Sequence, residues 1–284
     1  MHRLLQLLDT LAQSGTAEPV TVHGRGSEKF EDQDLIKMAK KKKITQKMVL
    51  NLVDIAKRKN EPHLIQPLWN TYHCQNQLYS SGRRFFGKYC KNRFCTTCLG
   101  IRKAELINKY LPIINTWEDP QFVTLTVKAQ PAKRLSKVID AMIRGFKRIN
   151  DKHKKRDQRS KGEKLIGARS LECNFNPNKR TYNPHFHIIV PNKEMANTIL
   201  EDWLSLWGKK WTNRYAQHIK PVDDNEVALI EIIKYGTKIF TEPDLKSKSK
   251  GASEKVYVAA MYNIFSAMHG HRLFDRFGFN LPKQ

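Results

Sequence analysis

The chain has 284 residues, 40% of them hydrophobic, and its 51 lysine and arginine residues against 27 acidic ones give a formal net charge of +24. The hydrophobic content is enough for a folded core, and no stretch approaches the ~20 apolar residues of a membrane span, so we expect no membrane partner. The charge predicts a polyanionic partner, because neutralising phosphates releases counterions and drives binding.

Residues 1–70 are expected to form a basic N-terminal arm that is partly disordered and partly helical. Gln6 and Asp9 interrupt its first apolar residues, which makes a poor signal peptide and favours a cytoplasmic protein. Residues 14–34 are polar and indicate loop or disorder. A helix is predicted next from apolar residues at helical spacing, Ile44, Met48, Leu52 and Ile55.

Four of the five cysteines form a C-x15-C-x4-C-x2-C pattern, Cys74, Cys90, Cys95 and Cys98. Thiolates that close a C-x2-C pair, with a second pair upstream, suit tetrahedral Zn²⁺. Disulfides are the alternative, but a protein without an export signal stays in a reducing compartment, which disfavours them. We predict a structural zinc module over residues 71–112, in which His73 could replace Cys74. The fifth cysteine, Cys173, is expected to be a small core residue.

The next elements alternate between helix and strand. A charged helix over residues 101–110 is expected to end near Pro112. Residues 121–128 alternate strictly and predict a central strand with Thr124 and Thr126 on one face.

A long amphipathic helix with apolar residues from Leu135 to Ile149 is predicted to cover one face of the sheet. Residues 147–164 are rich in lysine and arginine and are expected to form a mobile basic loop that contacts phosphates. The candidate DNA-binding residues there are Lys154, Lys155, Arg156 and Arg159.

The run N-P-H-F-H-I-I-V-P-N over residues 183–192 places His185 and His187 two positions apart on a predicted strand. Because successive side chains of a strand point to opposite faces, the two imidazoles share a face and can hold one metal ion. A strand over residues 165–174 and a hairpin turn would place Glu172 beside them as the third ligand. The alternative interpretation is a pair of half-exposed strand histidines and a solvated glutamate.

Residues 226–240 predict a helix with chemical groups on one face. Glu231, Tyr235 and Lys238 stand at positions i, i+4 and i+7, so they share that face. One interpretation is a phenolic nucleophile, a carboxylate that activates water and a lysine that steadies phosphate. On spacing alone, a buried tyrosine beside a structural ion pair is the plainer interpretation.

Three motifs in the order F-V-T-L-T-V, H-F-H-I-I-V and E-x2-K-Y-x2-K resemble those of rolling-circle replication initiator (Rep) proteins of small plasmids, in the HUH endonuclease superfamily. C-K-N-R-F-C-T-T-C and G-H-R-L-F-D-R-F-G are similar to further stretches of these proteins, so the resemblance spans residues 90–278. It implies an α+β fold with a central antiparallel β-sheet flanked by helices, an HUH or RRM-like palm. We assign this domain to residues 113–284, after the zinc-knuckle module.

The same resemblance implies that His185 and His187 bind a catalytic Mg²⁺ or Mn²⁺, that Tyr235 is the nucleophile and that Glu231 matches the glutamate of single-tyrosine members. It implies nicking of single-stranded origin DNA, a 5′-phosphotyrosyl intermediate and a 3′-OH primer, with a host helicase and polymerase as partners. An HUH-type transposase with the same chemistry is one alternative. Many such transposases use two tyrosines one turn apart, whereas Tyr257 and Tyr262 are five apart. A non-catalytic zinc-containing nucleic-acid-binding protein is the other alternative.

Overall fold

The computed structural model describes most of the chain as two compact units, one among the residues up to Glu105 and one from Leu106 onward. The described residues are 20–23, 27–30, 32–76, 78–81, 84–87, 89–92, 95–233 and 254–281. Within this part of the chain, no helix is long and apolar enough to cross a membrane.

The first unit is built on a pair of helices, α2 (Asp32–Arg58) and α3 (Pro62–Tyr72). The predicted helical spacing holds in α2, where Met48 and Leu52 are buried. Their partners in the core come from both helices, Val49, Val53, Ala56, Leu64 and Leu68.

A small sheet belongs to the same unit. It has four short strands, β1 (Val20–His23), β2 (Ser27–Phe30), β3 (Leu78–Ser81) and β4 (Arg84–Gly87). Their order is β2-β1-β4-β3, and only the β1–β4 pair is parallel.

Helix α4 (Thr96–Ile114) begins among the cysteines and is longer than the sequence predicts, with Pro112 inside it. The helix ends two residues after Pro112, so the expected end near this proline is confirmed, while the helix begins earlier than predicted. A proline removes one backbone hydrogen bond, but Ile114 is fully buried in the core of the second unit with Tyr110. Burying this apolar side chain favours the last turn over an earlier end.

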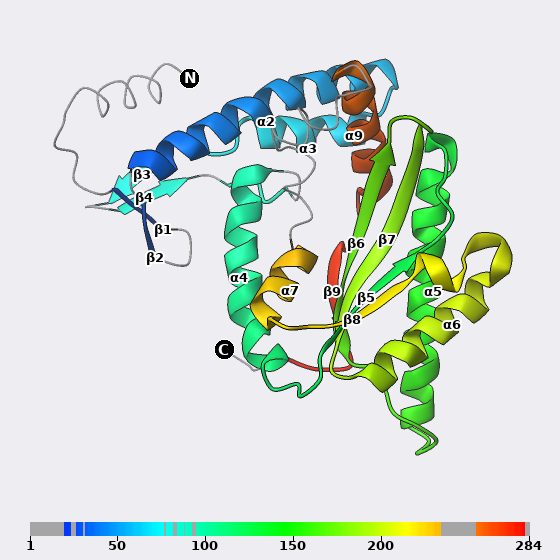
Figure 1. The fold of residues 1–284 in the computed structure, drawn as a ribbon. Helices are drawn as coiled ribbons and strands as arrows, with labels where there is room; N and C mark the ends of the chain where they lie inside the picture. Colours follow the sequence, from blue (N-terminus) through cyan, green and yellow to red (C-terminus); the bar gives the residue numbers. More distant parts are fainter. Residues whose placement is uncertain are drawn as a thin grey trace. The chain divides into compact units, whose positions relative to one another are not determined.

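The second unit contains a five-stranded, wholly antiparallel sheet in the order β8-β5-β7-β6-β9 (Figure 1). The strands are β5 (Gln121–Thr126), β6 (Gly167–Asn176), β7 (Thr181–Val190), β8 (His218–Pro221) and β9 (Phe274–Phe277). A turn over residues 177–180 joins β6 to β7, as the predicted hairpin requires. With helices on its faces, this sheet confirms the expected α+β class.

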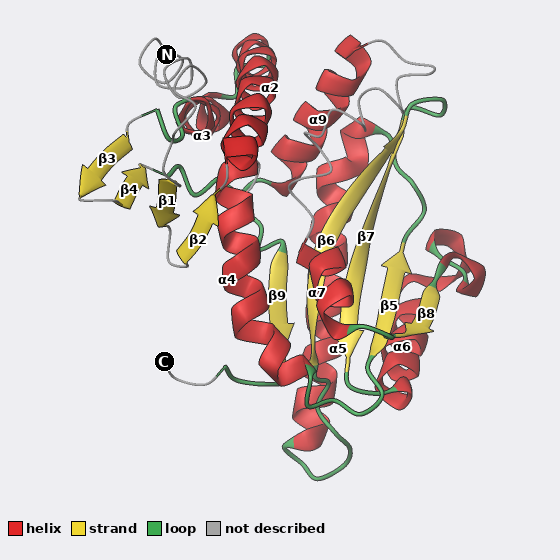
Figure 2. Cartoon of the chain, turned by 60° about the vertical axis from the view of Figure 1, so that its left-hand side comes forward, coloured by secondary structure: helices red, strands yellow, loops and turns green. Residues whose placement is uncertain are grey.

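One face of the sheet is covered by α5 (Ala132–Asp157), α6 (Lys193–Trp211) and α9 (Glu254–Met268) (Figure 2). Phe186 of β7 lies at its centre, with ring centroids 5.5 Å from Phe146 of α5 and 5.8 Å from Trp203 of α6. The alternation of β7 therefore turns Phe186 into the core and its neighbours His185 and His187 to the opposite face.

That opposite face is covered in part by the end of α4 and by α7 (Asn225–Ile233). Phe122 of β5 and Ile189 of β7 form its apolar core. The helices supply the remaining buried members, Tyr110, Ile114, Leu229, Ile232 and Ile233. This packing places α7 against the face of the sheet that carries His185 and His187.

The predicted mobile loop over residues 147–164 is wrong for most of its length, because α5 continues to Asp157. Lysine and arginine are good helix formers, and basic residues in the last turn are stabilised by the helix dipole. Ile149 and His153 are also buried one turn apart, which gives this stretch an inner face. Only the residues after Asp157 leave the helix before β6.

Candidate functional site

Glu172, His185 and His187 lie together on two paired strands of the second unit. The β6–β7 register sets Glu172 opposite His185 and Ser170 opposite His187. Glu172 Oε2 is 2.7 Å from His185 Nε2, and Glu172 Oε1 is 2.8 Å from His187 Nδ1. Glu172 is 1% exposed and His185 5%, while His187 is half-buried. The site is thus closed toward the sheet and open beside His187.

The atoms of this trio are arranged as a set of metal ligands. His185 Nδ1 lies 2.9 Å from the carbonyl oxygen of Asn183, a bond in which the ring nitrogen donates. On the other side of the ring, Nε2 lies at hydrogen-bond distance from Glu172 Oε2 and would offer its lone pair to an ion held beside the two groups. The approach of His187 Nδ1 to Glu172 Oε1 lacks the alignment of a hydrogen bond, and within the described part of the chain Oε1 accepts none.

A buried carboxylate oxygen that accepts no hydrogen bond is costly without a cation. The three ligand atoms lie within 4.8 Å of one another, so one ion can contact all of them. Two imidazoles and a carboxylate fit a divalent cation, and the bond from His185 to Asn183 would fix the ring as such ligands require. The residues present therefore fit the ion that the resemblance implies.

The surroundings of the trio leave its outer side polar. Thr124 is paired with His187, and Thr126 with His185, so both hydroxyls lie on the same face of the sheet. The ring of Phe122 lies 5.0 Å from that of His187 and separates it from the apolar core.

The helix that sequence motifs connect to the chemistry is only partly described. Glu231 lies in α7 and is half-buried. Tyr235 follows Ile233, the last residue of α7, by two positions, and it lies outside the described residues, as does Lys238.

The four predicted zinc ligands also lie together, in the first unit. Cys98 Sγ is 3.5 Å from Cys74 Sγ and 3.6 Å from Cys90 Sγ, and Cys95 belongs to the same group. These distances far exceed a disulfide bond of ~2.05 Å, and the cysteines are free. They approach the separation of about 3.8 Å between sulfurs bound to one zinc at ~2.3 Å.

Hydrogen bonds support this cluster from the backbone. The amides of Cys90 and Asn92 donate to the sulfurs of Cys74 and Cys90, at 3.5 and 3.4 Å. The Cys74 thiol, through its hydrogen bond, is the main cause that lowers the pKa of Cys95. Hydrogen bonds among the same thiols also lower the pKa of Cys90 and raise the pKa of Cys74 and Cys98. A metal would displace the protons that the group retains, because it binds the sulfurs as thiolates.

The structure also separates the two alternatives at residues 73 and 74. Cys74 is buried within the cluster, whereas His73 is exposed with its ring stacked on Trp69 at 5.8 Å. Lys42 Nζ donates to the carbonyl of Cys74, which ties α2 to the cluster.

The predicted DNA-binding residues lie apart from the histidines. The last turn of α5 and the turn after it carry Lys154, Lys155, Arg156 and Arg159, all exposed. Because α5 covers the Phe186 face of the sheet, these residues belong to the side opposite the trio.

Fold and sites together define an α+β protein with two candidate metal centres, one of cysteines and one of histidines with a glutamate. The sequence profile of a family described as replication protein matches residues 83–279, well over half of the chain. The chain therefore belongs to this replication protein family, which confirms the resemblance to plasmid Rep proteins drawn from the motifs.

The chain is also similar to several proteins that are named Protein rep. The chain is 28% identical over 243 residues to Protein rep of Streptococcus pneumoniae serotype 2 (strain D39 / NCTC 7466), covering 74% of each chain. It is 29% identical over 176 residues to Protein rep of Staphylococcus aureus, covering 56% of this chain and 74% of the relative. Protein rep of a Bacillus species matches over 130 residues at 30% identity, covering 43% and 41%. No solved structure matches.

Two features of the site are not predicted from the motifs. The carbonyl of Asn183 orients His185, and Phe122 shields His187 from one side. The Asn183 contact uses a backbone carbonyl, which every residue has, so the identity of the residue gives no signal for it. Phe122 is on the same predicted strand face as Thr124. Once this strand is paired with the histidine strand, that position predicts a contact between Phe122 and His187.

Proposed function

We propose that this replication protein is a rolling-circle initiator that nicks single-stranded origin DNA through Tyr235. The observation that carries the proposal is the convergence of Glu172, His185 and His187 on the face of the sheet against which α7 packs. Two paired strands hold these ligands rigidly, and the sequence of α7 leads to the tyrosine two residues after its last described residue.

The trio would hold the scissile phosphate in place for attack. A divalent cation, Mg²⁺ or Mn²⁺, would supply Lewis-acid polarisation of a phosphate oxygen and stabilise the charge that develops on it. Glu172 is the most buried of the three and would bind the ion as a carboxylate. His187, the most exposed of the three, would be the ligand that faces the incoming DNA.

The first chemical step forms a bond from Tyr235 Oη to phosphorus and breaks the bond from phosphorus to the 3′-oxygen. The phenol loses its proton and the leaving oxygen gains one, which gives a 5′-phosphotyrosyl protein and a free 3′-OH. Lys238 would steady the phenolate or the phosphate by its charge. A host polymerase would extend the 3′-OH, and a host helicase would keep the template single-stranded.

Glu231 would end the cycle as a general base. It would take a proton from water as the water oxygen attacks phosphorus, and Tyr235 would leave with a proton restored. Because Glu231 precedes Tyr235 by four residues, a helical register would set the two side chains on one face. Release would then need no second tyrosine.

The cysteine cluster and the end of α5 would serve binding rather than chemistry. A zinc ion held by four thiolates has no open position for substrate and would stabilise the first unit. Lys154, Lys155, Arg156 and Arg159 would contact the phosphate backbone of origin DNA on the sheet face away from the trio.

Tyr235→Phe tests the proposal, because it removes the attacking oxygen and keeps the ring. The wild-type protein, incubated with a single-stranded origin oligonucleotide and Mn²⁺, should give a covalent adduct on a denaturing gel. Tyr235→Phe should give neither adduct nor nicked product.

Tyr257→Phe and Tyr262→Phe are matched controls. Both tyrosines are buried in α9, so their variants should form the adduct as the wild type does. An adduct that persists in Tyr235→Phe would place the nucleophile elsewhere. A wild-type protein that binds the oligonucleotide and never nicks it would favour the non-catalytic alternative.

A further inference from the structure

One aromatic side chain stands fully in solvent beside the sheet. Tyr215 is 98% exposed, more than any other large hydrophobic residue exposed in the described part of the chain. An aromatic ring usually covers much of its surface, because burial of 150–250 Å² is favourable. A ring held wholly in water is therefore available to a partner.

The backbone that carries Tyr215 is fixed on both sides. The residue is at the centre of η1 (Arg214–Ala216), where Asn213 Oδ1 accepts from the amide of Ala216 at 3.0 Å. Thr126 Oγ1 donates to the carbonyl of Ala216 at 3.1 Å. The side chain of buried Gln217 then accepts from the amide of Thr126 at 2.7 Å. The ring is thus presented from an ordered turn, which lowers the entropy lost on binding.

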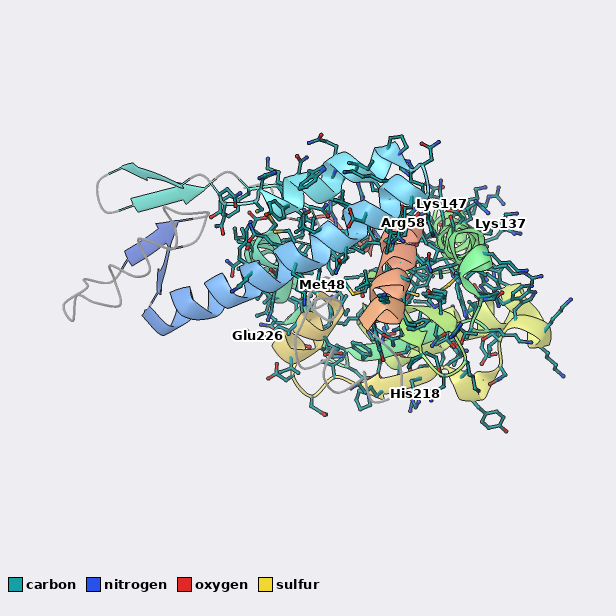
Figure 3. All side chains as sticks on the ribbon, turned by 90° about the horizontal axis from the view of Figure 1, so that it is seen from above. Met48, Arg58, Lys137, Lys147, His218 and Glu226 are labelled. Carbon is teal, nitrogen blue, oxygen red and sulfur yellow. The ribbon has the colours of Figure 1, made fainter. Side chains whose placement is uncertain are left out.

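The turn leads directly into β8, and β8 connects to the trio across the sheet. His218 is paired with Thr124, which is paired with His187, so their three side chains share a face. Two strand spacings of ~4.8 Å separate His218 from His187 by about 10 Å across the sheet. Figure 3 shows His218 at the β8 side of the second unit.

Lys220 lies on the same face, one rung further along. It is paired with Phe122, and its Nζ is 5.3 Å from the centre of that ring. Both His218 and Lys220 are exposed. They therefore place hydrogen-bond donors on the edge strand of the sheet, on the face that carries the histidine site.

Cationic side chains are present near the turn. Residues 203–222 contain four lysine or arginine residues, and acidic residues follow only after β8, at Asp223 and Asp224, and precede at Glu201 and Asp202. Arg214 is paired with Glu201, a residue outside this stretch, so we assign it no contact with the ligand. An exposed ring combined with positive charge is the arrangement that binds single strands, because bases stack on the ring while cations follow the backbone.

We propose that Tyr215 stacks on an unpaired base of single-stranded DNA, while His218 and Lys220 contact its phosphates. The β8 edge would then form part of the path by which the strand reaches His187. The part of this inference that leads the strand to His187 rests on the proposed function. The binding of single-stranded DNA by Tyr215 does not, and it can be measured without nicking.

The experiment measures binding of a fluorescent oligothymidylate of about 20 nucleotides by anisotropy, without added divalent cation. Tyr215→Ala should raise its Kd about 5- to 100-fold, as expected for one lost stacking contact. Tyr215→Phe and Tyr215→Trp should restore binding, because stacking needs a ring and no hydroxyl. Binding of a blunt DNA duplex should be unchanged in all three variants, since its bases are already stacked.

Lys220→Ala and Lys133→Ala form a pair matched in charge. Lys220 lies on the trio face, and Lys133 is an exposed residue of α5 on the other side of the sheet. Only the first should weaken oligothymidylate binding beyond the general effect of one charge. An unchanged Kd in Tyr215→Ala overturns the proposal, as does equal weakening for duplex, which would indicate a general contact.

The experiments can reject the Tyr215 stacking site and the nicking chemistry independently of each other. Weaker oligothymidylate binding by Tyr215→Ala, together with a wild type that never nicks, would support the stacking site and reject the nicking chemistry. Normal binding by Tyr215→Ala, together with a covalent adduct in the wild type, would do the reverse.

Discussion

The two candidate metal sites differ in the atoms they offer and in how they are enclosed. The cluster in the first unit has four sulfurs, and Cys74, Cys95 and Cys98 are buried. The trio in the second unit has two imidazoles and one carboxylate, and His187 is half-buried. Four ligands complete a tetrahedral ion, whereas three leave a position for substrate.

The number of ligands and their exposure suit the cysteine cluster to a structural ion and the trio to a catalytic one. The cysteines come from the end of α3 and the start of α4, with Cys90 between them, so an ion there would join segments that are distant in sequence. The trio needs no such help, since the β6–β7 ladder already positions its side chains. Metal loss should therefore affect folding at one site and chemistry at the other.

Cys95→Ser should have the largest effect on stability. It removes one of four thiolates, and structural zinc contributes an apparent ~10–16 kcal/mol at neutral pH in small zinc domains. The variant should lose the zinc, about one ion per chain, that elemental analysis should find in the wild type purified under reducing conditions. The first unit should then unfold at lower urea concentration.

Cys173→Ser is the matched control, because Cys173 is buried on β6 outside the cluster. It should retain the zinc. A wild type that contains no zinc, or a Cys95→Ser variant that keeps it, would contradict the assignment of the cysteine cluster as a structural zinc site.

Glu231→Gln should separate the first cleavage from the hydrolysis of the adduct. It preserves shape and removes the base, so the first cleavage should persist while hydrolysis of the adduct slows by about 10²-fold or more. The measurement is the lifetime of the isolated adduct after excess unlabelled oligonucleotide is added. An unchanged lifetime would leave Glu231 as a structural partner within α7.

Replacing both Lys154 and Lys155 by alanine should have the smallest effect, since both residues lie on the side of the sheet opposite the trio. The slope of log Kd against log salt for duplex DNA should fall by about 2, close to 0.9 per lost phosphate contact. The rate of nicking at saturating protein should not change. An unchanged slope would show that the end of α5 does not touch DNA.

Much of this arrangement can be predicted because it depends on local periodicity. Alternation in β5 and β7 assigns Thr124, Thr126, His185 and His187 to one face, and a hairpin brings Glu172 to them. Residue 157 as the end of α5 is harder to predict, because a charge-rich stretch is helical only when tertiary packing supplies an inner face. Here Ile149 and His153 supply it.

The exposure of Tyr215 could not be predicted for a related reason. Residues 212–217 are mostly polar and indicate a surface turn, but they do not show how far the ring of Tyr215 extends into solvent. That depends on the conformation of the turn, which forms hydrogen bonds with distant Thr126. The Asn183 contact to His185 is likewise a backbone feature, since any residue has a carbonyl to offer. Contacts that use the backbone leave little trace in residue identity.

The central claim is that the trio, and not the cysteines, serves the nicking reaction. Its most direct test is the double variant His185→Ala, His187→Ala with a single-stranded origin oligonucleotide and Mn²⁺. We expect normal zinc content, nearly normal DNA binding and a nicking rate lower by about a thousandfold or more, since metal stabilisation of the transition state is worth several kcal/mol. Nicking at the wild-type rate would contradict the assignment of these histidines as ligands of the catalytic ion.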